Sequence, residues 1–248
     1  MKYASFDLEI ALEIPQGDFD LKKAGPLGIT CIGVALSDTK KEIYWHEPGQ
    51  LSKEECKEVV REFWDLAEQG YTFLTWNGLG FDFRVLAEES GMRYKCAKLA
   101  LEHHVDMMLY VTFVKGWYLS LQSALEGAGC KGKLKEVILK SGDVLKGMEG
   151  SQAPALWKAG EYDAVLRCLQ SDILQPLDLV QYIEQHKEIV WTSKAGKPQC
   201  VLVPEMLLAY ECYLLPEPDT SWMDSPPTRE GFIEWVPQVM KDMLLTEF

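Results

Sequence analysis

The sequence lacks long apolar runs and paired cysteine motifs, and both absences exclude classes of protein. In 248 residues, no stretch approaches the roughly 18 uninterrupted apolar residues that a membrane helix needs. The seven cysteines are scattered and never spaced as CxxC, which argues against a disulfide framework and against a thiolate zinc site. The first residues also show no basic and apolar leader pattern. We therefore expect a cytoplasmic protein without a membrane partner.

Positive charge is scarce as well. The chain has 25 lysines and arginines against 38 aspartates and glutamates, for a formal net charge of −13. Phosphate contacts normally come from basic residues, but a carboxylate site that binds divalent cations reverses the local sign of the charge. The lysines form two clusters: Lys131, Lys133, Lys135 and Lys140, and Lys187, Lys194 and Lys197. Each cluster is either a nucleic-acid contact or ordinary solvated surface, so composition leaves nucleic acid open as a partner.

The hydrophobic pattern predicts an α/β fold with a mixed central sheet flanked by helices. The expected strands are Tyr3–Glu9, Thr30–Leu36, Glu42–Trp45, Tyr71–Trp76 and His104–Asp106. Ser52 and Glu55 have the spacing of a capping box at the start of a helix that ends near Gly70. A second helix is expected to begin near Phe81, and a long one to span about residues 161–186, kinked or broken at Pro176.

The last part of the chain differs in character. Lys194 to Lys197 is typical of a hairpin tip, and irregular proline-containing stretches follow it. We expect residues 1–186 to form one domain, and residues 187–248 to form a C-terminal appendage packed on it by Trp191, Trp222 and Trp235.

Two acids lie close together on the first predicted strand. Asp7 and Glu9 are two residues apart, so both side chains leave the same face of a strand, while Phe6 and Leu8 face the other side. Two adjacent carboxylates on a central strand are costly unless a cation neutralises them. Oxygen ligands of this kind suit Mg²⁺ or Mn²⁺, although such pairs also occur on solvated edges.

Two further acids occupy positions where they could join this pair. Asp82 follows the turn at Asn77-Gly78, which comes directly after a buried strand, and open α/β sheets place their ligands near such strand ends. Asp172 lies on the long predicted helix among apolar residues, so it is either a buried hydrogen-bonded residue or a metal ligand.

Taken together, these motifs resemble those of the DEDD superfamily of 3′–5′ exonucleases. The motifs are Asp-x-Glu on the first strand, Asn-Gly-x-x-Phe-Asp after a later strand and an aspartate on a late helix. More narrowly, the chain looks like a bacterial family related to the exonuclease domain of family B DNA polymerases. The resemblance covers about residues 1–186 and implies a ribonuclease H-like fold.

The resemblance also implies a function and a set of site residues. It makes Asp7, Glu9, Asp82 and Asp172 the catalytic carboxylates that hold two divalent cations, Mg²⁺ or Mn²⁺. The implied substrate is DNA or RNA with a free 3′ end, in single-stranded form, which is cut by a two-metal-ion mechanism. Asn77 and Phe81 would bind the terminal nucleotide, while simple core packing is the alternative role for Phe81.

The sequence departs from the family pattern at one position. These exonucleases place a tyrosine four residues, or a histidine five residues, before the last aspartate, and here those positions hold Cys168 and Arg167. Tyr162 lies about three helical turns away. Either Cys168 orients the water weakly, or His103, Tyr110 or Tyr118 from another segment takes the role, or the protein has lost most of its rate.

Three functions are therefore compatible with the sequence. The first is a metal-dependent 3′–5′ exonuclease, and the second is a catalytically weak or inactive nucleic-acid-binding module of the same fold. The third is a metal phosphohydrolase that acts on small nucleotides, which the low content of lysine and arginine would suit. The pair His103-His104 and Asp106 are expected to have structural roles.

Overall fold

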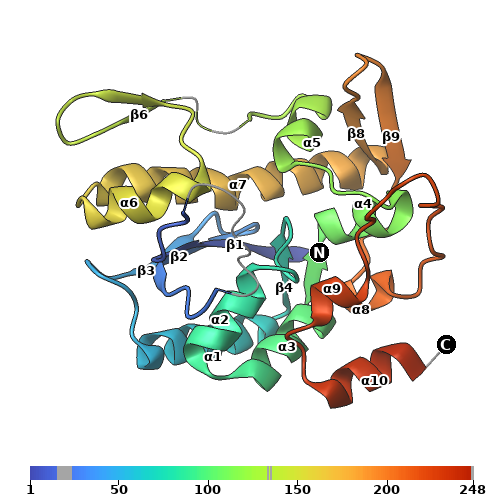
Figure 1. Ribbon diagram of the computed structural model, residues 1–248, viewed down its shortest axis with the longest axis horizontal. Coiled ribbons are helices and arrows are strands. Elements are labelled where there is room, and N and C mark those ends of the chain that lie inside the picture. Colours follow the sequence, from blue (N-terminus) through green and yellow to red (C-terminus); the bar gives the residue numbers. More distant parts are fainter. Residues whose placement is uncertain (16–23, 133, 135, 247–248) are drawn as a thin grey trace.

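The computed structural model of the chain describes residues 1–15, 24–132, 134 and 136–246, and it is built around one five-stranded sheet (Figure 1). The strand order in this sheet is β3-β2-β1-β4-β5. These strands are β1 (Lys2–Ile10), β2 (Ile29–Leu36), β3 (Glu42–His46), β4 (Tyr71–Thr75) and β5 (His104–Asp106). All five agree with the predicted segments to within a few residues.

The sheet is mixed. The strand β1 pairs antiparallel with β2 and parallel with β4, while β2–β3 is antiparallel and β4–β5 is parallel. Two separate hairpins lie outside this sheet: β6 (Glu136–Ile138) with β7 (Val144–Lys146), and β8 (Glu188–Thr192) with β9 (Pro198–Leu202). The predicted α/β architecture with a mixed central sheet is confirmed, and the chain turns between β8 and β9 at Lys194–Lys197 as expected.

Helices cover both faces of the sheet (Figure 1). One face carries α1 (Lys53–Glu68), α2 (Asp82–Ser90) and α3 (Arg93–Glu102), and the long α7 (Tyr162–His186) crosses the other face over β1, β2 and β4. The remaining helices are α4 (Met107–Lys115), α5 (Leu121–Gly127), the 3₁₀ turn η1 (Gly150–Gln152), α6 (Ala153–Lys158), α8 (Ala209–Cys212), α9 (Glu230–Ile233) and α10 (Gln238–Thr246).

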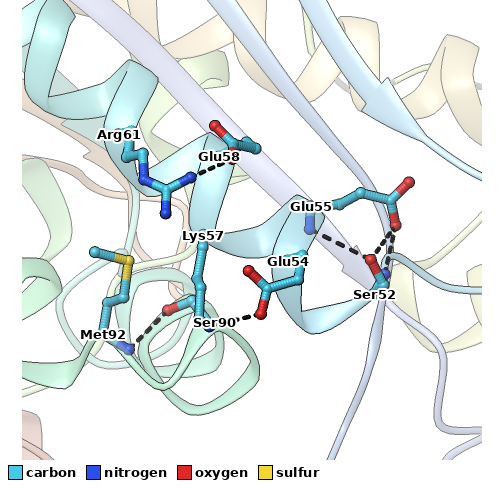
Figure 2. A network of polar contacts seen from close by, with 8 residues as sticks. All are labelled: Ser52, Glu54, Glu55, Lys57, Glu58, Arg61, Ser90 and Met92. Atoms are coloured by element: carbon cyan, nitrogen blue, oxygen red, sulfur yellow. Dashed lines mark hydrogen bonds and ion pairs between the residues drawn. The ribbon is translucent and has the colours of Figure 1, made fainter.

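The local sequence explains where α1 begins. Ser52 accepts a hydrogen bond from the Glu55 amide, and the Glu55 carboxylate accepts one from the Ser52 amide, so the predicted capping box is present (Figure 2). Lys57 pairs with Glu54 one turn further along the exposed side of the helix. The buried side of α1 contributes Phe63 to the core under the sheet.

The long helix α7 corrects one expectation. It runs from Tyr162 to His186 without interruption, so Pro176 does not break it into two helices. Pro176 is buried and has no amide hydrogen to donate to the preceding turn.

The residues after α7 pack against the rest of the chain through α8, α9 and α10 (Figure 1). Trp191 and Trp235 are buried as predicted, but Trp222 is 68% exposed and its predicted packing role is wrong. All seven cysteines are free thiols in the structure. Among the described residues, no helix is long and apolar enough to cross a membrane.

Candidate metal-binding active site

Three of the four predicted carboxylates meet between β1 and α7. Asp7 and Glu9 leave the same face of β1, and α7 crosses that face and brings Asp172 to them. One carboxylate oxygen from each residue lies within 4.8 Å of the oxygens from the other two. Glu9 is only 7% exposed, whereas Asp7 and Asp172 are half-buried. Like charges this close are costly in the absence of a cation.

A glycine on β2 allows α7 to approach the sheet at this point. Gly33 pairs with Asp7 across the two strands. A Cβ atom at Gly33 would lie 3.1 Å from Leu169 Cγ and 3.2 Å from Ile173 Cδ1, both on α7. These contacts are closer than ordinary van der Waals packing, so a side chain here would require the Leu169 and Ile173 side chains of α7 to move by a few tenths of an ångström. Because Asp172 is adjacent to Ile173, Gly33 helps to set the distance between the carboxylates.

The fourth carboxylate, Asp82, lies deeper. It is the first residue of α2, a position that favours an acid because of the helix dipole, and it is only 4% exposed. Burial raises the pKa of Asp82 well above its usual value, and the nearby charges of Asp7 and Asp106 raise it further. One of its oxygens, Oδ1, is buried without a hydrogen-bond partner. Asp82 is therefore close enough to Asp7 to feel its charge, but it is not one of the three clustered acids.

The residues present fit a divalent cation. The donors are all carboxylate oxygens, the ligands that Mg²⁺ and Mn²⁺ prefer. The unpartnered buried oxygen of Asp82 points to the same conclusion, because such an atom is otherwise expensive.

The turn that carries Asp82 is held from two sides. Asp106 accepts hydrogen bonds from the backbone amides of Asn77 and Leu79 at 2.9 and 3.1 Å, and it also caps α4. From the C-terminal part of the chain, the Trp235 indole donates to the Leu79 carbonyl oxygen at 2.8 Å. Asn77 itself has a left-handed backbone with φ of 77°. The expected structural role of Asp106 is confirmed.

A buried histidine supports the same turn. The His104 Nε2 atom lies 2.8 Å from Thr75 Oγ1, which accepts a hydrogen bond from the Gly78 amide. The other ring nitrogen of His104 lies 3.1 Å from the Ala100 carbonyl oxygen. Burial lowers the pKa of His104, so the neutral ring is favoured. The expectation that this histidine is structural is confirmed.

The three clustered carboxylates line a cleft of about 640 Å³ together with Asn77 and Phe81. We call this the carboxylate cleft. Five of the six predicted site residues therefore line one cavity, and Asp82 lies behind it. The other side of the cleft is formed by the loop and helix start at residues 118–122 and by Trp76. Apart from Tyr118, which the sequence offered as one of three alternative residues, sequence reasoning did not place these residues at the site. Trp76 donates to the Leu119 carbonyl oxygen at 3.0 Å and so connects the two sides.

The structure also shows what surrounds the position of the missing tyrosine or histidine. Cys168 is buried and its thiol lies 3.2 Å from Met148 Sδ, while Arg167 lines a different depression with Tyr44. Among the described residues, neither Cys168 nor Arg167 lines the carboxylate cleft.

Of the three alternative residues, one reaches the cleft. His103 packs against the ring of Trp64 on the opposite face of the sheet, and the Tyr110 hydroxyl donates to the Leu202 carbonyl oxygen. Tyr118 lines the cleft. No sequence pattern marked it, because it lies in a loop.

The comparisons with known proteins agree with this architecture. A model of the RNase H superfamily matches residues 20–167, more than half of the chain and including Asn77, Phe81 and Asp82, whereas Asp7, Glu9 and Asp172 lie outside the matched range. No curated protein matches the chain. Members of this superfamily are commonly nucleases and typically use divalent metal ions. The predicted ribonuclease H-like fold is confirmed, and the chain belongs to the RNase H superfamily.

Proposed function

We propose that this protein is a metal-dependent 3′–5′ exonuclease of the DEDD type, related to the exonuclease domain of family B DNA polymerases, which hydrolyses phosphodiester bonds of DNA or RNA. The observation that carries the proposal is the meeting of Asp7, Glu9 and Asp172 within 4.8 Å at a cleft large enough for a nucleotide. The buried Asp82 beside Asp7 supplies the fourth carboxylate.

In this proposal the four acids would hold two divalent cations, Mg²⁺ or Mn²⁺. When bound, such cations activate water and neutralise the charge that develops on the scissile phosphate. The chain itself positions the substrate: Phe81 and Asn77 line the same cleft and would contact the terminal nucleotide at its free 3′ end. Asp106 and Trp235 act as positioning residues, because they fix the turn that carries Asn77, Phe81 and Asp82.

The second candidate is a weak or inactive nucleic-acid-binding module of the same fold. It is favoured by the contact of Cys168 with Met148 at the position where relatives carry a tyrosine. General-base assistance typically contributes about 10²–10⁴-fold to a rate. If no other side chain takes this role, turnover is slow but still depends on the carboxylates.

Digestion of labelled oligonucleotides tests the proposal. The purified protein is incubated with 5′-labelled single-stranded DNA and RNA in the presence of Mg²⁺, Mn²⁺ or EDTA. A ladder that shortens stepwise from the 3′ end and disappears in EDTA is expected. The variant Asp7→Ala should show no ladder, whereas Asp65→Ala, which removes an exposed acid on α1, should cut as the wild type does.

The same assay separates the alternatives. Internal cuts in place of a 3′ ladder would indicate an endonuclease. Absence of cleavage with both cations, from protein that is folded and binds the oligonucleotide, would contradict the enzyme and support the binding module.

A further inference from the structure

A second groove, of about 490 Å³, adjoins the carboxylate cleft. The two cavities share Tyr118, Leu119 and Ser120, which lie in the loop between α4 and α5. The other wall of the second groove is the β8–β9 hairpin, which contributes Trp191 and Lys194. We call this the hairpin groove. It shares one wall with the carboxylate cleft, and none of the four predicted carboxylates lines it.

The hairpin wall is firmly attached. Gly127 in the last turn of α5 packs directly against β8, where an added Cβ would lie only 2.0 Å from the Val190 carbonyl oxygen. The Tyr110 hydroxyl of α4 donates to the Leu202 carbonyl oxygen of β9 at 2.9 Å. Figure 1 shows the hairpin beside α5, on the same side of the sheet as α7. It lies outside the range matched by the superfamily model.

The chemistry of the hairpin groove differs from that of the carboxylate cleft. None of the described residues that line it is acidic, and its charged residue is the exposed Lys194 at the hairpin tip. Tyr118 is 57% exposed, and Trp117 is half-buried and packs edge-on against the buried Trp191 at 5.5 Å. In a chain of net charge −13, a groove that combines an exposed tyrosine, a half-buried tryptophan and a lysine is a departure from the average surface.

We propose that the hairpin groove binds the single-stranded nucleotides on the 5′ side of the terminal nucleotide. Aromatic rings beside a positive charge are the combination that holds single strands without reading their sequence, since every base can stack and every linkage carries a phosphate. Bases would stack on Tyr118 and Trp117, and Lys194 would pair with a phosphate. The direction of the strand rests on the proposed function, which puts the 3′ end at the carboxylates.

The groove predicts a preference for long substrates over dinucleotides, and binding tests it without chemistry. Fluorescence anisotropy in EDTA would measure the Kd of 5′-labelled single-stranded DNA and RNA of about 20 nucleotides, longer than the roughly 4–16 nucleotides that comparable sites cover. We expect Lys194→Glu to weaken binding about tenfold and to reduce the slope of log Kd against log salt by roughly one. Lys95→Glu makes the same charge change at an exposed lysine of α3, across the sheet, and as the matched control it should bind as the wild type does.

A second pair of variants tests the ring itself. Tyr118→Ala should weaken binding about tenfold, whereas Tyr118→Phe keeps the ring and should retain most of the affinity. Because Tyr118 and Lys194 are both exposed, we expect all of these variants to fold. Thermal unfolding verifies this.

Hydrolysis then separates this inference from the proposed function. The readout is kcat/KM for the long oligonucleotide divided by kcat/KM for a dinucleotide, which should fall about tenfold in Lys194→Glu and stay at the wild-type value in Lys95→Glu. If the long strand binds through Lys194 and Tyr118 but nothing is hydrolysed, the groove stands and the exonuclease fails. If hydrolysis occurs but the Kd and the preference for long substrates do not change in the Lys194 and Tyr118 variants, the exonuclease stands and the proposed binding groove is wrong. A folded wild-type protein that binds no oligonucleotide also overturns it.

Discussion

The two faces of β1 carry opposite kinds of chemistry, although the residues alternate along one strand. On one face, the Phe6 ring packs edge-on against Phe63, Phe73 and Phe83 at centroid distances of 5.0, 5.7 and 4.8 Å. On the other face, Asp7 and Glu9 meet Asp172. The apolar face stabilises the sheet, and the acidic face holds like charges together at a cost. The comparison indicates that the position of the acids depends on stability supplied from the opposite side of the same strand.

The largest expected effect comes from neutralising the acidic face. Asp7→Asn should lower kcat/KM on the order of 10³-fold, because a cation ligand contributes several kcal/mol to the transition state. The Tm of this variant in EDTA at neutral pH should not fall, because the change relieves repulsion among clustered carboxylates. Calorimetry and the ladder assay measure the two quantities. A large drop in Tm would show that Asp7 is structural.

The apolar face should respond in the opposite way. Phe6→Ala removes a ring that is 1% exposed and should cost about 3–5 kcal/mol, a large part of the roughly 5–15 kcal/mol that stabilises a typical domain. Urea unfolding measures this loss. Phe6→Leu is the milder comparison, since it retains much of the buried volume. Equal stability of Phe6→Ala and wild type would refute the division of labour between the two faces.

Gly33 on β2 lies beside Asp7 and against α7, so packing at this position affects the acidic face of β1. Gly33→Ala crowds Leu169 and Ile173 on α7, and we expect it to displace the helix slightly and to cost about 1–3 kcal/mol through overpacking. Because the displaced helix carries Asp172, activity should fall more than the loss of folded protein explains. Gly49→Ala is the control, since a Cβ there has no atom within 4 Å. A stable variant with wild-type activity would mean that α7 adjusts without moving Asp172.

The smallest effect concerns pH. Burial lowers the pKa of His104 in the folded protein, whereas the unfolded chain takes up a proton near pH 6.5. His104 therefore contributes a decrease in the free energy of unfolding as pH falls below about 6.5, by at most about 1.4 kcal/mol per pH unit, until the folded form is protonated as well. Asp82, whose pKa burial raises, contributes a slope of the opposite sign. Urea unfolding between neutral and mildly acidic pH measures the total slope. The contribution of His104 is the difference between the slopes of the wild type and His104→Gln, and the variant should lose less stability as pH falls.

Much of the fold was predictable from local pattern. The alternation of Phe6, Asp7, Leu8 and Glu9 fixes which residues share a face once β1 is assigned. The capping box at Ser52 marked the start of α1 correctly. These features depend on neighbours within a few residues, so one sequence suffices to find them.

The parts that sequence reasoning missed depend on contacts between distant segments. Trp235 donates a hydrogen bond to Leu79, which lies 156 residues earlier in the chain. The sequence near either residue contains no pattern that predicts this contact. The sequence named Tyr118 as one of three alternatives without a reason to prefer it, and its place at the cleft depends on Trp76, which holds the loop that carries it. The exposed Trp222 shows the opposite error, since a tryptophan in the sequence does not reveal whether a core is available to it. The sequence did not show which lysine of the two clusters would line a groove, and the structure places Lys194 in one. Lys133 and Lys135 of the other cluster lie outside the described residues.

Locating bound manganese is the most direct test of whether the carboxylate cluster is a metal site. Crystals of the protein soaked in MnCl₂ would be measured for anomalous scattering, alongside crystals of Asp7→Asn treated in the same way. We expect anomalous density among Asp7, Glu9, Asp172 and Asp82 in the wild type, and its loss or clear weakening in the variant. Manganese bound elsewhere, or no density among these four acids at saturating MnCl₂, would contradict the assignment of this carboxylate cluster as a metal site.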